Sequence, residues 1–196
     1  MSTESTSTDL LERLRDPGNQ EAWRQFDERY RELILRFALR RGLQPADAED
    51  VRQAVLLSLT RSFQGFVYRP DLGGFRDYLG TVIRNAVHRH LRGQELRPET
   101  LSSSAPEPVS NDQTAWDEEW QLHHYRRAMK TLRTTFHAES MAIFDDLLAG
   151  ARPEDVAARH GTHVDNVYKV KQRVRDRLKE LVSAQIEEEE FRERRG

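Results

Sequence analysis

The stretch PEDVAARHGTHVDNVYKVKQRVRDRLKEL, residues 153–181, decides how the C-terminal half of the chain folds. Its apolar side chains recur every three or four residues, which indicates amphipathic helices rather than strands. Pro153 suits the first turn of a short helix, and Gly161 supplies a turn before a longer helix that begins at about Val164. A short helix, a turn containing glycine and a longer helix are typical of a helix-turn-helix.

The longer helix is basic on the side that faces away from its valines. Six Lys and Arg residues but only two Asp residues lie between positions 164 and 179. The second helix of a helix-turn-helix enters the major groove of DNA with its first residues on base edges. We therefore expect base contacts from Thr162, His163, Asp165, Asn166 and Lys169, phosphate contacts from Lys171, Arg173 and Arg175, and an outward position for Gln172. A solvated basic face on a bundle helix is the alternative.

The apolar pattern is helical in the rest of the chain as well. Asn19 can cap a helix that ends at Gly42, Pro45 opens a second helix, and a third runs from about Phe75 to Gly93. Further helices are expected over 116–133 and 138–148. The expected core positions are Trp23, Phe26, Tyr30, Ile34 and Phe37, then Ala48, Val51, Val55, Leu59 and Phe63, then Leu79, Val82 and Ala86. The prediction is an all-α chain of two small helical bundles, the second containing the helix-turn-helix.

A segment rich in Pro, Ser, Glu and Thr separates the two bundles. It carries almost no large apolar residues, so it cannot bury enough surface to offset the entropy lost on ordering, and we expect a flexible acidic linker. The predicted parts are a disordered N-terminus over 1–18, a helical domain over 19–93, the linker over 94–115, a second helical domain over 116–184 and a charged tail over 185–196.

Charge is distributed unevenly along the 196 residues. The chain has 31 Lys and Arg against 33 Asp and Glu, a net charge of -2 that at first argues against nucleic-acid binding. The net charge is +2 over residues 1–93, -6 over 94–124, +4 over 125–186 and -2 over the last ten residues. Two mildly basic bundles are therefore separated by acidic residues, a pattern that a sum over the chain conceals.

The chain contains no cysteine and no apolar run of about 18 residues. Disulfide scaffolds and thiolate metal sites are thus excluded, and a cytoplasmic protein without membrane insertion is expected. His160 and His163 have metal-ligand spacing but no third ligand nearby in the sequence. The adjacent His123 and His124 are no better as candidate metal ligands. No metal or other cofactor is therefore predicted. No motif argues for catalysis, so we expect that the protein is not an enzyme.

The third helix of the first bundle has an asymmetry like that of the last helix. With its apolar stripe turned inward, Arg84, Asn85, His88, Arg89 and Arg92 are expected to project outward. The preceding loop carries Phe66, Tyr68 and Arg69. Aromatic rings beside cations suit a single strand of nucleic acid, because exposed bases stack on rings while the backbone attracts positive charge. The two aromatic residues could equally cover the end of the bundle.

Three quoted features together resemble a known family. The acidic helix DAEDVRQAVLLSL (47–59), the stretch FRDYLGTVIRN (75–85) and the C-terminal helix-turn-helix are similar to those of bacterial sigma factors of the extracytoplasmic-function (ECF) type. The resemblance covers about residues 20–93 and 120–183. It implies a promoter-specificity subunit with two partners, core RNA polymerase and promoter DNA, and it leaves open an anti-sigma protein or other regulator as a third.

The resemblance also implies a role for each candidate surface. The helix after Pro45, whose acidic residues suit either a helix start or partner binding, would dock on the polymerase through Asp47, Glu49, Asp50, Gln53 and Leu57. Recognition of the minus-ten element would fall to Phe66, Tyr68, Arg69, Asp71, Arg76, Arg84, Asn85, His88, Arg89 and Arg92. The outward residues of the last helix would read the minus-35 element, with a base preference left open by the unusual helix start at His163.

Two other functions fit the same residues. A conventional transcription regulator would use only its helix-turn-helix on DNA, while the N-terminal bundle senses a ligand or dimerises; it would bind a palindromic site without polymerase. A protein-binding helical module would make both basic faces incidental.

Overall fold

The computed structural model describes residues 7–63, 74–95 and 110–190. These residues form eight helices and no strand, so the all-α prediction is confirmed. Internal contacts divide the chain into two units, of which the first runs to Gln121 and the second is Leu122–Glu187. Each unit has its own hydrophobic core.

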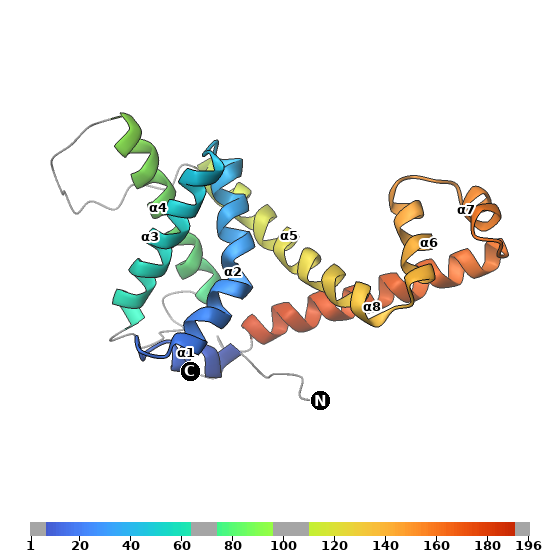
Figure 1. Cartoon of the computed structure of the whole chain (residues 1–196), viewed down its shortest axis with the longest axis horizontal. Helices are drawn as coiled ribbons and strands as arrows, with labels where there is room; N and C mark the ends of the chain where they lie inside the picture. The colour runs from blue at the N-terminus through green and yellow to red at the C-terminus, as the bar shows by residue number, and fades with distance from the viewer. Residues whose placement is uncertain (1–6, 64–73, 96–109, 191–196) are drawn as a thin grey trace. The chain divides into compact units, whose positions relative to one another are not determined.

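Three long helices form the body of the first unit (Figure 1). They are α2 (Gln20–Arg40), α3 (Pro45–Phe63) and α4 (Phe75–Glu95), and α3 packs against both of the others. Asn19 caps α2 as predicted, because its side-chain oxygen accepts a hydrogen bond of 3.1 Å from the Ala22 amide. Gly42 follows α2 with a φ of 89°, a conformation that favours glycine.

The core of the first unit agrees closely with the periodicity of the sequence. All five positions predicted for α3 are buried, and Phe26, Tyr30, Ile34 and Phe37 of α2 are buried with them. In α4 the buried residues are Leu79, Ile83, Ala86 and Val87, whereas Val82 is only half-buried. The inward face of α4 is therefore turned by about one residue from the predicted one.

The predicted disordered N-terminus is wrong for residues 7–14. A short helix, α1 (Ser7–Arg13), packs on α2, and Leu10 and Leu14 are buried in the core of the first unit. These two leucines are four residues apart and share one helix face. The Ser- and Thr-rich composition of the region concealed this pair.

Helix α5 (Ser110–Thr135) begins six residues before the predicted start at 116 and includes the end of the predicted linker. The first part of α5, residues 110–121, belongs to the first unit, because Ala115, Trp116 and Trp120 are buried in the core of that unit. The boundary between the units consequently lies within α5, after Gln121, and not at a linker end near residue 115. Most of the predicted linker lies outside the described residues.

The second unit contains the rest of α5, the helices α6 (Ala138–Leu148) and α7 (Pro153–Arg159), and α8 (Val164–Glu190) as far as Glu187. The bounds of α6 and the starts of α7 and α8 coincide with the predicted ones. Val167, Val170 and Val174 of α8 are buried with residues of α5, α6 and α7. Helix α8 continues to Glu190, so the predicted charged tail from 185 begins as helix. None of the described helices is long and apolar enough to cross a membrane.

Candidate nucleic-acid and protein interfaces

The outward face of α8 presents most of the residues expected to contact DNA bases and phosphates. His163, Asp165, Asn166, Lys169, Gln172, Arg173 and Arg175 are exposed, and Thr162 and Lys171 are half-buried. The Asn166 amide donates a hydrogen bond of 2.9 Å to the Thr162 hydroxyl, and the Gln172 amide donates one of 2.9 Å to Asp176. These bonds orient two polar side chains on the exposed face before any ligand arrives.

Tyr168 is a further candidate that the residue patterns did not single out. Its side chain is 49% exposed and it lies on α8 next to Lys169. The sequence could have identified Tyr168, because it is a large aromatic residue outside the apolar stripe of Val167, Val170 and Val174. Its ring could contact apolar groups of a ligand that the polar neighbours bind.

The turn before α8 is anchored to α6 through one carboxylate. Asp146 accepts a hydrogen bond of 2.8 Å from the His160 Nε2 and forms an ion pair of 2.7 Å with Arg159. Gly161 then takes a φ of 59° and leads into α8. The hydrogen bond from His160, supported by Arg159, lowers the pKa of the Asp146 carboxyl.

We expect the stabilising effect of Asp146 to depend on pH. Because its pKa is lowered in the folded state, its contribution is present above the ordinary Asp pKa of about 3.9 and is lost as pH falls through the folded value. The difference in unfolding free energy between the natural protein and Asp146→Asn, measured by urea unfolding monitored by circular dichroism, should shrink between neutral pH and pH about 3. A difference that stays constant over this range would contradict the role of Asp146.

The structure divides the basic residues of α4 between two faces. Arg89 and Arg92 are exposed and Asn85 is half-buried, as expected for an outward face. Arg76, Arg84 and His88 instead face the first part of α5. The prediction that Arg84 and His88 project outward is therefore wrong, because α5 begins earlier than predicted and packs on this side of α4. Phe66, Tyr68, Arg69 and Asp71, the loop part of the predicted surface, lie outside the described residues.

Acidic residues of α5 contact this second face of α4. Asp117 forms an ion pair with Arg76, and Asp112 lies 2.5 Å from the His88 Nε2 and also pairs with Arg41. Asp112 is only 1% exposed. Burial lowers the pKa of the Arg84 guanidinium, although Asp112, Asp77 and Asp117 act in the opposite direction.

The acidic start of α3 is largely engaged within the first unit. The Asp47 carboxylate lies 3.1 Å from the His90 Nε2, and Glu49 forms ion pairs with Arg31 and, at 2.6 Å, with Arg52. The hydrogen bond from Arg52 is the main reason that the pKa of Glu49 is lowered. Farther along the helix, Asp50, Gln53 and Leu57 are exposed, and Leu57 is 60% exposed. The five predicted docking residues are thus two carboxylates engaged within the first unit and three accessible side chains.

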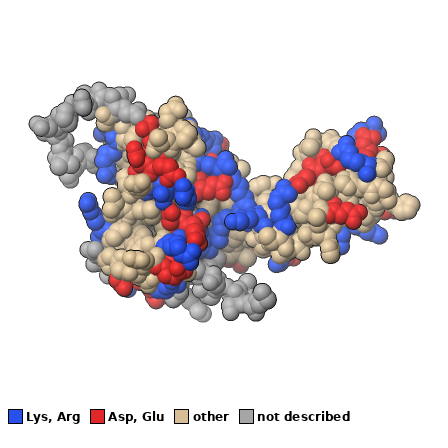
Figure 2. Space-filling model, in the orientation of Figure 1, with Lys and Arg blue, Asp and Glu red and all other residues tan. Residues whose placement is uncertain are grey.

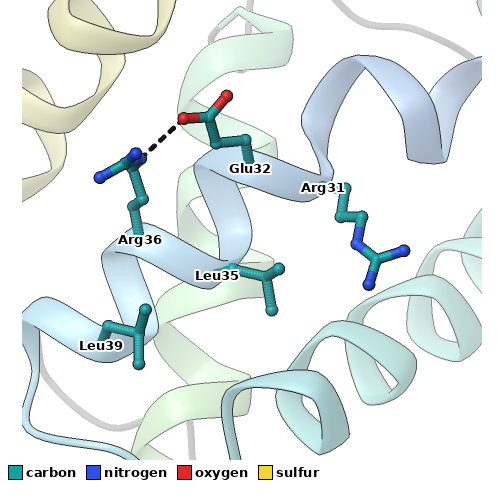
Figure 3. A pocket seen from close by; sticks show the side chains of 5 residues that line it. All are labelled: Arg31, Glu32, Leu35, Arg36 and Leu39. Atoms are coloured by element: carbon teal, nitrogen blue, oxygen red, sulfur yellow. Dashed lines mark hydrogen bonds and ion pairs between the residues drawn. The ribbon is translucent and has the colours of Figure 1, made fainter. Parts of the chain in front are cut away.

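A hollow on α2 is an additional apolar feature that sequence reasoning missed (Figure 3). It has a volume of about 340 Å³ and is lined by Arg31, Glu32, Leu35, Arg36 and Leu39. Arg36 and Glu32 form an ion pair of 2.7 Å at its rim, and Leu39 is 43% exposed. The sequence could have predicted this surface, because Leu35 and Leu39 lie outside the apolar stripe that forms the buried face of α2.

Charge is mixed on the face of the molecule drawn in Figure 2, where blue and red side chains are interspersed over each unit. Among the residues that the structure describes, no group of three or more His, Cys, Asp and Glu side chains is arranged to hold a metal ion. His160 is bound to Asp146, and the His124 Nδ1 lies 3.2 Å from the Gln185 side-chain oxygen.

Comparison with known proteins identifies the first unit. The family model for sigma-70 region 2 matches residues 26–97, which include most of α2 and the whole of α3 and α4. No curated protein matches the chain significantly. The matched residues contain both the α3 surface with Leu57 and the basic faces of α4. The chain therefore carries region 2 of the sigma-70 family of sigma factors, which associates it with promoter recognition and binding to RNA polymerase.

Proposed function

We propose that the chain is a sigma factor of the ECF type, which binds core RNA polymerase and reads the minus-ten element with its first unit and the minus-35 element with its second. The observation that carries this proposal is the sigma-70 region 2 match over residues 26–97. The exposed polar and basic face of α8, which follows a short helix and a glycine turn, supports the second DNA contact.

The polymerase would bind the accessible part of α3. Leu57 supports this assignment because an exposed leucine flanked by polar residues is suited to the centre of a protein interface. Asp50 and Gln53 would form its polar rim, whereas Asp47 and Glu49, through their contacts with His90, Arg31 and Arg52, would hold α3 in place. The hollow at Leu35 and Leu39 on α2 is a second apolar surface for the same partner.

The minus-ten element would be bound by the loop before α4 together with Arg89 and Arg92 on α4. Trapping unstacked bases can offset an unpairing cost of a few kcal/mol, so opening needs no cofactor and no catalytic residue of this chain. The outward residues of α8 would read the minus-35 duplex in the major groove. Most nonspecific affinity would come from the polymerase, so we expect the free chain to bind promoter duplex weakly.

Run-off transcription with purified core polymerase and a promoter library tests the proposal. Specific initiation that requires this chain is the expected result. Absence of initiation, together with binding of the free chain to a palindromic duplex, would instead favour a conventional transcription regulator. Absence of both initiation and DNA binding would favour a protein-binding module.

The variant Leu57→Asp should weaken binding to core polymerase about tenfold, since it places a charge in an apolar interface. The measurement is a titration of labelled chain with core polymerase, followed by fluorescence anisotropy. Leu148→Asp is a matched control because Leu148 is 55% exposed but lies on α6 in the second unit. Equal losses for the two variants would show that Leu57 has no special part in polymerase binding.

A further inference from the structure

The first part of α5 covers a basic stripe on α4. Arg76, Gly80, Arg84 and His88 are spaced four residues apart, so they lie along one side of α4. Asp112, Trp116 and Trp120 have the same spacing on α5, and Asp117 adjoins them. Asp117 pairs with Arg76, and Asp112 pairs with His88. Oppositely charged helix faces are thus matched along about three turns.

The same part of α5 also contacts the end of α2. Asp112 pairs with Arg41, and Glu118 pairs with Arg40. Three acidic residues of α5 therefore meet four basic residues of the first unit: Arg40, Arg41, Arg76 and His88. Carboxylates held by arginines occupy positions in which phosphate oxygens are also bound well, because both groups accept hydrogen bonds from a guanidinium.

At Gly80 the backbone of α4 lies directly against the Trp116 ring of α5. A Cβ atom on Gly80 would lie 2.6 Å from the Trp116 Cε2 and 3.1 Å from the Arg84 Nη1. Trp116 is fully buried there. Any side chain at position 80 would therefore collide with the indole ring, so the contact between α4 and α5 depends on this glycine.

Arg84 lies under α5 without full compensation for its burial. Its Nη1 is buried and has no hydrogen-bond partner within the described ranges, while its other terminal nitrogen donates to the Thr81 hydroxyl at 3.2 Å. A buried guanidinium nitrogen without an acceptor costs free energy. An anion that replaced α5 on this stripe would supply the missing acceptor, which favours exchange of the helix for such a ligand.

We propose that the first part of α5 is an intramolecular mimic of a nucleic-acid backbone that masks the stripe of Arg76, Arg84 and His88, and that single-stranded DNA binds this stripe once α5 leaves it. This inference rests on the proposed binding of the minus-ten element by α4. It adds regulation to that site, because DNA and the residues Asp112 and Asp117 compete for the same basic side chains.

The test measures how tightly the full-length natural protein and its variants, without polymerase, bind a fluorescein-labelled single-stranded DNA oligonucleotide. Asp112→Asn/Asp117→Asn removes the competing carboxylates and should bind about tenfold more tightly than the natural protein. The dependence on salt should also steepen, by about 0.7 in the slope of log K against log salt for each phosphate gained. The matched control is Glu21→Gln/Glu28→Gln, which changes the net charge equally but alters contacts with Arg24 and Gln25 on α2, away from the α4 stripe.

A second variant pair tests the masking without changing charge. Gly80→Ala should displace Trp116 and raise the DNA affinity, whereas Gly93→Ala on the same helix should not, because a Cβ on Gly93 meets no atom within 4 Å. Acrylamide quenching of tryptophan fluorescence should increase for Gly80→Ala alone, since Trp116 and Trp120 become accessible. Unchanged helicity by circular dichroism shows that α5 has moved without unfolding of the first unit.

Unchanged DNA affinity and salt slope in both Asp112→Asn/Asp117→Asn and Gly80→Ala would overturn the masking. Equal gains in the charge control would overturn it too, since net charge would then explain them. Run-off transcription by the natural chain separates this failure from that of the proposed function: initiation with no gain in affinity refutes only the masking, while absence of initiation refutes the sigma-factor proposal itself.

Discussion

Phe26→Ala should lower the unfolding free energy of the first unit by about 3–5 kcal/mol, the usual cost of deleting a buried aromatic side chain. Phe26 is fully buried. Its ring centroid lies 4.8 Å from that of Tyr30, 6.1 Å from that of Trp23 and 6.3 Å from that of Phe75. The truncation therefore leaves a cavity and also removes three aromatic contacts, two within α2 and one with Phe75 at the start of α4.

Urea unfolding followed by tryptophan fluorescence measures this change selectively. All three tryptophans, at positions 23, 116 and 120, belong to the first unit, so the signal reports on that unit. Leu39→Ala on the same helix is the control, because Leu39 is 43% exposed and its loss should change stability by no more than about 0.5 kcal/mol. Similar effects of the two substitutions would contradict the central position of Phe26 in the core.

Lys169→Ala and Asn166→Ala should each weaken binding of the minus-35 duplex by about 1–3 kcal/mol, the range for one lost base contact. Both side chains are exposed on the first turns of α8, where a groove-binding helix contacts base edges. The loss should depend on the base pair that each residue reads. The measurement is binding of the chain in complex with core polymerase to promoters carrying every single substitution in the minus-35 element.

Lys179→Ala controls for the loss of one positive charge on the same helix. Lys179 is exposed but lies ten residues beyond Lys169, outside the expected base-reading positions. It should lower affinity slightly and equally on all sequences, as a distant charge acts on the whole phosphate backbone. If Lys169→Ala behaved in this uniform way, Lys169 would be a phosphate contact and would carry no sequence preference.

Several helices could be predicted from the sequence because their signals are local. Helix starts and ends are marked by Asn19, Pro45, Pro153 and Gly161 through properties of their own side chains or backbone. Helix α6 also has the predicted bounds. The buried face of α3 could be predicted equally well, because five apolar residues at helical spacing specify one buried face whichever element packs against it.

The contacts of α5 could not be predicted in this way. Asp112 lies in a window rich in Ser, Pro and Glu, so its composition indicated a linker, yet it is buried against Arg41 and His88. The pairing of these residues depends on helices that are distant in sequence, and one chain offers no local signal for it. Burial of Leu10 and Leu14 under α2 was hidden for the same reason.

By itself the sequence determined the all-α class, the helices bounded by proline, asparagine and glycine, and the basic outward face of α8, since each follows from spacing and turn chemistry within a few residues. Only the tertiary structure decided which cations of α4 are accessible. Arg89 and Arg92 are exposed, whereas Arg84 and His88 lie against α5, although all four are outward by periodicity. Helical periodicity predicts which face of a helix is buried in the core. It does not predict whether another helix covers the opposite face, because that packing depends on contacts between residues distant in sequence.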